Sequence, residues 1–128
     1  EGQKYYIRVK QYNSIGTYTL NIGQKKEIAD ITAYTAVSDS IQYTDQENDY
    51  AFVPSVSGTY RFELSDVPDG TDLSLYAYNS GWERITYDQN LDSGDGISVE
   101  VSSGKTYYIR VRQYNKYGTY KLHIIKER

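Results

Sequence analysis

Two stretches of this 128-residue chain are nearly the same, and they begin 102 positions apart. Residues 2–22 read GQKYYIRVKQYNSIGTYTLNI and residues 104–124 read GKTYYIRVRQYNKYGTYKLHI, with 14 of 21 positions identical. A period of this length is that of a whole domain, and not that of a short solenoid repeat. We therefore predict an excised piece of a tandem array. Residues 1–25 would be the terminal hairpin of a preceding repeat, and residues 26–128 one complete domain.

Each copy alternates with a period of two residues, which is typical of a half-buried β-strand. In the second copy one predicted face carries Tyr107, Ile109, Val111 and Gln113, and the opposite face carries Tyr108, Arg110, Arg112 and Tyr114. The turn residues 115–118 then lead to a second alternating run, so we predict a β-hairpin in each copy. Because a lone hairpin is marginally stable in water, the N-terminal hairpin could instead dock onto this domain or swap into another.

The middle of the chain reads as short strands separated by turns that are rich in Gly, Pro and Asp. The predicted strands cover residues 49–53, 59–64, 73–78, 82–87 and 97–101. Residues 29–36 are ambiguous between a short helical turn and an irregular edge strand. The whole pattern predicts an all-β fold, an antiparallel jelly-roll-type β-sandwich with an additional N-terminal β-hairpin.

Composition and motifs argue against several classes of function. The formal net charge of −3 gives no field for nucleic acid, and there is no cysteine for a disulfide or a thiolate metal site. No apolar run approaches the ~20 residues of a membrane span. The single histidine, His123, is replaced by Asn21 in the other copy, and no Ser/His/Asp order, zinc-type histidine pair or phosphate loop is present. We predict that the chain is not an enzyme.

Five motifs, in order and at similar spacing, carry a resemblance to a known family. They are NDYAF at residues 48–52, GTYRF at 58–62, TDLSLY at 71–76, GKTYYIRV at 104–111 and GTYKL at 118–122. Over residues 28–125 the chain resembles the bacterial pre-peptidase C-terminal domains and the related collagen-binding domains of clostridial collagenases. The resemblance implies a jelly-roll-like sandwich appended to a secreted or cell-surface bacterial protein, which serves as a binding or accessory module.

The predicted binding site is a tyrosine- and arginine-rich sheet face. The chain has 16 tyrosines, which combine an apolar ring with a polar hydroxyl and suit recognition. The site residues would be Tyr76, Tyr78, Tyr87, Tyr108, Arg110, Arg112 and Tyr114. Exposed rings between cations suit an extended extracellular polymer, either a collagen-like peptide or a polysaccharide. The same row could instead be ordinary cross-strand pairing, or could pack on a neighbouring repeat. In that case the chain is a structural repeat or spacer whose hairpin mediates self-association.

We predict no cofactor, and a structural calcium ion is the one exception that the sequence leaves open. Some members of the family bind calcium near the start of the domain, but residues 25–30 here lack the clustered Glu and Asn ligands. The acidic run at Asp45, Glu47 and Asp49 does match in position. Calcium prefers carboxylate and carbonyl oxygens, so these three residues are the candidate metal ligands.

Overall fold

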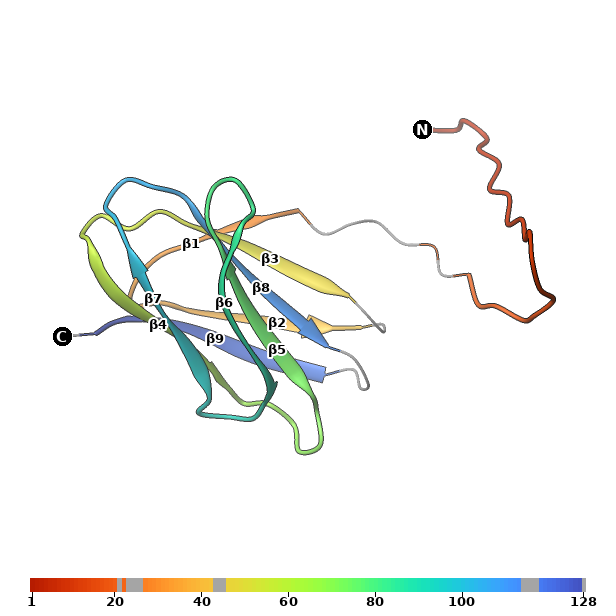
Figure 1. Ribbon diagram of the computed structural model, residues 1–128. Helices are drawn as coiled ribbons and strands as arrows, with labels where there is room; N and C mark the ends of the chain where they lie inside the picture. The colour runs from red at the N-terminus through yellow and green to blue at the C-terminus, as the bar shows by residue number, and fades with distance from the viewer. Residues whose placement is uncertain (21, 23–26, 43–45, 114–117, 128) are drawn as a thin grey trace.

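All regular structure in the described part of the chain is β-strand (Figure 1). The computed structural model describes residues 1–20, 22, 27–42, 46–113 and 118–127. The strands within them are β1 (Ala29–Ile31), β2 (Ala36–Ile41), β3 (Glu47–Phe52), β4 (Gly58–Ser65), β5 (Leu73–Tyr78), β6 (Arg84–Leu91), β7 (Gly96–Val101), β8 (Tyr107–Gln113) and β9 (Gly118–Lys126). The described residues contain no helix that could cross a membrane. The all-β prediction is therefore confirmed.

The strands form two facing sheets with a jelly-roll order. One sheet has the order β1-β3-β8-β5-β6 and the other has the order β2-β9-β4-β7. From β2 to β9 the chain passes to the opposite sheet at every step except β5 to β6, which are neighbours in one sheet. The predicted jelly-roll sandwich is confirmed. The ambiguous residues 29–36 begin with the edge strand β1, pass through a turn at residues 33–34 and end at the start of β2. β1 pairs with β3, and this one pair among the described strands is parallel, with Ala29 opposite Tyr50.

The predicted hairpin in residues 104–124 is wrong, because β8 and β9 lie in opposite sheets. β8 is hydrogen-bonded between β3 and β5, whereas β9 is hydrogen-bonded between β2 and β4. The alternating pattern could not distinguish the two arrangements. An arch between two sheets and a hairpin within one sheet both place one apolar row of each strand on the core.

The N-terminal copy forms no strand in its described residues. Residues 1–20 are exposed throughout, and Figure 1 shows them running away from the sandwich. The predicted N-terminal hairpin is thus not formed in this structure. The equivalent strands β8 and β9 each pair with a strand on both sides, and a lone hairpin without such neighbours is marginally stable in water. The assignment of residues 1–25 to a preceding repeat remains a prediction.

The core fills the space between the two sheets with alternate residues from each strand. Ile109 and Val111 of β8 face Leu122 and Ile124 of β9 from the opposite side of this core, and all four are fully buried. Phe52 packs edge-on against two rings of β4. Each such side chain contributes about 1.5–3 kcal/mol when it is fully buried. The central strands of both sheets therefore hold the sandwich together.

A chain of polar side chains joins the two sheets at one end of the core. The Gln46 amide donates to Asn48 Oδ1 at 2.7 Å, and the Asn48 amide donates to the Tyr120 hydroxyl at 2.8 Å. The Tyr120 and Tyr50 hydroxyls lie 2.5 Å apart, and Tyr50 donates to Asp39 Oδ2 at 2.7 Å. Since Tyr50 gives its proton to Asp39, it accepts one from Tyr120. The buried hydroxyl groups of Tyr50 and Tyr120 therefore both have hydrogen-bond partners.

Alkaline pH should destabilise the fold through these two tyrosines. Burial raises the pKa of both Tyr50 and Tyr120, and the neighbouring Tyr120 and Asp39 raise that of Tyr50 further. The unfolded chain then loses its tyrosine protons first, so the stabilisation is complete below about pH 10 and is lost as the pH rises above it. The free energy of unfolding should fall by up to about 1.4 kcal/mol per pH unit for each of the two groups.

Urea unfolding in steps between about pH 8 and pH 11 measures this loss around the ordinary tyrosine pKa. The variant Tyr50→Phe should be less stable at neutral pH but should show a shallower fall at alkaline pH, because it has one fewer shifted proton. A free energy of unfolding that stays constant across this range would contradict the prediction.

Candidate functional site

The outer face of the five-stranded sheet carries three cross-strand rows. Strand pairing places Tyr108 between Ala51 and Tyr78, Arg110 between Asp49 and Tyr76, and Arg112 between Glu47 and Ser74. Tyr87 of β6 lies opposite Tyr76. The structure therefore brings together six of the seven residues that the sequence proposed for a binding face. Tyr114 lies outside the described residues.

Five rings on this face form what we call the aromatic ladder. In spatial order they are Tyr87, Tyr76, Tyr78, Trp82 and Tyr108. Tyr76 stacks on Tyr87 with ring centroids 5.7 Å apart and on Tyr78 at 6.4 Å. Trp82 is tilted against Tyr78 at 5.5 Å and stacks on Tyr108 at 4.1 Å, with the ring planes only 3° apart. The rings thus cross β6, β5 and β8 without a break.

The members of the ladder differ in how much of each ring a ligand could reach. Tyr76 is only 7% exposed, although it points away from the core, because its neighbours cover it. Trp82 covers one side of Tyr108. The rings that remain open are Tyr87, at 46% exposed, and Trp82, at 39%. A ligand would therefore contact Trp82 and Tyr87, while Tyr108 stacks on Trp82 and Tyr76 stacks on Tyr87 beneath the exposed surface.

Two arginines accompany the ladder in different ways. The Arg110 guanidinium lies 5.2 Å from the Tyr78 ring centre and 5.3 Å from that of Trp82. It donates two hydrogen bonds to Asp49, at 2.7 and 3.1 Å, and these bonds raise the Arg110 pKa further above its ordinary value. Arg84 is exposed and holds its guanidinium 4.3 Å from the Tyr87 ring centre. Arg110 is therefore a fixed part of the face, and Arg84 is the cation that faces solvent.

A tight turn positions Trp82 over Tyr108. The Asn79 side-chain oxygen accepts hydrogen bonds from the backbone N–H groups of Gly81 and Glu83, at 3.0 and 2.9 Å. The Trp82 backbone N–H donates to the Asn79 backbone carbonyl at 3.0 Å. Trp82 itself has a left-handed backbone, with φ of 60°, which is uncommon for a residue that is not glycine. The turn thus fixes the indole before any ligand arrives.

Sequence reasoning missed both Trp82 and Arg84 as site residues. Residues 82–87 were expected to form a strand, but β6 begins at Arg84 and Trp82 belongs to the turn before it. The available signal was that Trp82 is the only tryptophan of the chain and directly follows the turn-forming residues 79–81. Alternation with a period of two assigns only strand residues to a face of the sheet, so it could not assign Trp82, which lies in a turn.

The proposed metal ligands are occupied by arginine where the structure describes them. Asp49 binds Arg110, and Glu47 lies 3.4 Å from Arg110 and 3.7 Å from Arg112. Asp45 lies outside the described residues. Within the described ranges, no group of three or more His, Asp or Glu side chains is arranged to hold a metal ion. A calcium ion at this position remains a prediction, and it would have to compete with the two guanidinium groups.

One hydrogen-bonded pair on the other sheet has the composition of a catalytic dyad. Ser65 Oγ and His123 Nε2 are 2.6 Å apart, on neighbouring strands β4 and β9. A serine nucleophile also needs a group that orients the histidine and donors for an oxyanion. His123 makes no ion pair among the described contacts, and the equivalent residue in the N-terminal copy is Asn21. The pair is best explained as a cross-strand hydrogen bond.

The fold of the chain is similar to that of a bacterial domain of known structure. This is the pre-peptidase C-terminal domain of collagenase from Bacillus anthracis, which matches with a TM-score of 0.63 and 18% sequence identity. The match covers 80% of this chain and 98% of that one. No protein-family model and no curated protein sequence matches the chain. The resemblance that the sequence motifs predicted is confirmed at the level of the fold.

Proposed function

We propose that this sandwich is a non-catalytic binding module of a secreted or cell-surface bacterial protein. Its ligand would be an extended polymer, either a collagen-like peptide or a polysaccharide, held on the aromatic ladder. The observation that carries the proposal is the fixed pair of open rings, Trp82 and Tyr87, with the exposed Arg84 cation beside Tyr87. The fold similarity to a domain of a collagenase supports an accessory role outside the cell.

The chemistry of the ladder fits a flat and polar ligand. Aromatic rings stack on sugar faces or proline rings, and tyrosine hydroxyls and guanidinium groups supply hydrogen bonds along the same surface. The Asn79 turn and the ring stacking hold Trp82 in place. A site that is already ordered loses little conformational entropy on binding, so more of the contact energy becomes affinity.

The function can be tested by pull-down of the chain with insoluble collagen and with a panel of plant and bacterial polysaccharides. The variants Trp82→Ala and Tyr87→Ala should each weaken binding about tenfold or more, as expected for central aromatic residues. Tyr108→Ala combined with Tyr6→Ala, the equivalent change in the N-terminal copy, should weaken binding as well, because Trp82 then has no ring on which to stack. Each measurement is repeated with calcium and with a chelator, which tests the predicted metal separately.

A matched control is Tyr34→Ala. Tyr34 is an exposed aromatic residue outside the ladder, and its φ of 63° is nearly that of Trp82. It should therefore report any backbone effect of alanine in a left-handed turn, and it should leave binding unchanged. If Trp82→Ala and Tyr34→Ala bind the same ligand equally well, or if no ligand in the panel binds, the proposed function is wrong.

A further inference from the structure

The N-terminal copy matches the closing strands β8 and β9 at every buried position that the structure describes. The buried residues of these strands are Tyr107, Ile109, Val111, Gln113, Tyr120, Leu122 and Ile124. Their counterparts, 102 positions earlier, are Tyr5, Ile7, Val9, Gln11, Tyr18, Leu20 and Ile22, which are all identical. The chain therefore contains a second set of side chains with the volume and alternation that this core requires.

The match extends to the polar contacts of the two strands. Arg8 corresponds to Arg110, which binds the largely buried Asp49. Tyr18 corresponds to Tyr120, whose hydroxyl joins Asn48 to Tyr50. Tyr6 corresponds to Tyr108, on which Trp82 stacks. In the place of β8 and β9, residues 5–22 would restore the core, the polar chain between the sheets and the base of the aromatic ladder.

Three of the positions that differ between the two copies make contacts that favour the C-terminal copy in the sandwich. Lys121 pairs with Asp66 at 3.0 Å, and the N-terminal copy has Thr19 there. His123 bonds to Ser65, and Asn21 stands in its place. Arg112, which lies 3.7 Å from Glu47, corresponds to Lys10. These contacts are at the surface, where each contributes little, so the preference for the C-terminal copy is modest.

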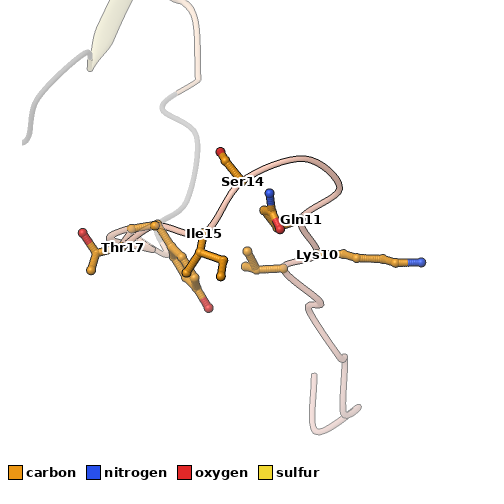
Figure 2. Close-up of a pocket in the computed structure, with 8 residues that line it drawn as sticks. Lys10, Gln11, Ser14, Ile15 and Thr17 are labelled. Atoms are coloured by element: carbon orange, nitrogen blue, oxygen red, sulfur yellow. The ribbon is translucent and has the colours of Figure 1, made fainter.

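The free N-terminal copy leaves apolar side chains in water. Ile7 is 69% exposed, Tyr18 69% and Ile22 85%. The segment turns back at residues 12–13, and Val9, Ile15 and Tyr18 line a shallow pocket there, but this fold-back forms no strand (Figure 2). Because β8 and β9 belong to different sheets, a copy of them cannot bury both apolar rows by pairing with itself. It needs a sandwich body on both sides.

We propose that residues 5–22 are a second closing pair, and that their partner is the β1–β7 body of a sandwich of this same kind. In a tandem array that body would be a neighbouring repeat. The chain also permits closure of its own body. Tyr34 N–H donates to the Ile124 carbonyl, so a docked Ile22 would lie near Tyr34, five residues from Ala29. The seven residues from Ile22 to Ala29 can span ~23 Å, which is longer than the five residues from Ala29 to Tyr34 can span. The connection is therefore long enough for Ile22 to dock beside Tyr34 of its own chain.

The test disables one closing pair at a time in the full chain. Val111→Asp places a carboxylate at a fully buried position of β8, and Val9→Asp makes the same change in the spare copy. Val9→Asp should leave the melting temperature unchanged. Val111→Asp should still fold, with a lower melting temperature, because residues 5–22 replace β8 and β9. The double variant should be unfolded.

Limited trypsin digestion shows which copy is docked. In the unmodified chain, cleavage after Arg8 and Lys10 should be fast and cleavage after Arg110 and Arg112 slow. In Val111→Asp this order should reverse. Fluorescence of Trp82, the only tryptophan, should stay native in Val111→Asp because Tyr6 takes the place of Tyr108. Gel filtration then distinguishes closure within one chain, which gives a monomer, from closure of a second copy, which gives a dimer or larger species. Both results support the proposal.

Two results would overturn the proposal. If Val111→Asp is as unfolded as the double variant, or if its trypsin pattern does not reverse, the N-terminal copy cannot act as a closing pair. A chain that ends at Ser103 gives the same test without a charged core residue. It should fold with Val9 intact and unfold with Val9→Asp, and equal behaviour of these two chains would count against the inference.

Discussion

Replacing Gly96 with alanine should lower the free energy of unfolding by about 3 kcal/mol or more, the upper end of what overpacking costs. Gly96 lies in β7 opposite Glu63 of β4. A Cβ atom at this position would lie 2.2 Å from the Phe62 carbonyl oxygen and 2.9 Å from the Glu63 Cα. These are backbone atoms of a strand that is paired on both sides, so β4 cannot move aside without breaking its register with β9.

Chemical denaturation of Gly96→Ala measures this effect, and Gly81→Ala is its control. A Cβ at Gly81 would meet Asn79 Oδ1 at 3.5 Å, which is an ordinary contact. Gly81 lies in an exposed turn, so its substitution should change stability by no more than about 0.5 kcal/mol. If the two variants were equally stable, the close approach of β7 to β4 would have to be absent in solution.

Removing the Arg110 guanidinium should cost about 3 kcal/mol in a chain that also carries Val9→Asp, because it leaves a buried carboxylate without its cation. Val9→Asp is kept in all variants of this pair, so that Arg8 of the N-terminal copy cannot replace Arg110. The Asp49 side chain is 5% exposed and the Arg110 side chain 20%, so the pair is only partly screened by water. The variant Arg110→Met keeps most of the side-chain volume and so isolates the loss of charge. It also takes away the cation that lies beside Tyr78 and Trp82, so the Trp82 fluorescence should change together with stability.

Two further variants separate charge from packing at this pair. Arg110→Met combined with Asp49→Leu removes both charges, and it should recover much of the lost stability, since no buried charge is left unpaired. Arg84→Met removes the exposed cation over Tyr87 and should cost less than about 1 kcal/mol. Equal losses in Arg110→Met and Arg84→Met would mean that burial of the Asp49 pair does not matter.

The positions of the strands could be predicted from the sequence because the alternation is regular. The expected strand at residues 73–78 has the same bounds as β5. The one at 59–64 is one residue shorter than β4 at each end, and the one at 97–101 begins one residue later than β7. The inward and outward rows of β8 also follow from alternation alone, since Ile109 and Val111 are buried and Arg110 is partly exposed. Local periodicity determines which side chains share a face.

The pairing of β8 and β9 and the place of Trp82 could not be predicted in the same way. Which strands pair depends on contacts between distant residues, such as Asn48 with Tyr120, and a period of two is the same in an arch and in a hairpin. The position of Trp82 depends on the hydrogen bonds within the Asn79 turn, and on the distance from that turn to Tyr108. Both features are set by tertiary structure.

The order of strands has a consequence for how the chain folds as it is synthesised. Of the described strands of this sandwich, β8 and β9 leave the ribosome last, yet each has a neighbouring strand on both sides in its sheet. Neither sheet can be completed until they emerge, so the sandwich closes late and through contacts of high sequence separation, which makes folding slow. The nascent chain already carries a second sequence for the same two strands ahead of β1. Vectorial synthesis thus presents residues 5–22 to the growing body before β8 and β9 exist.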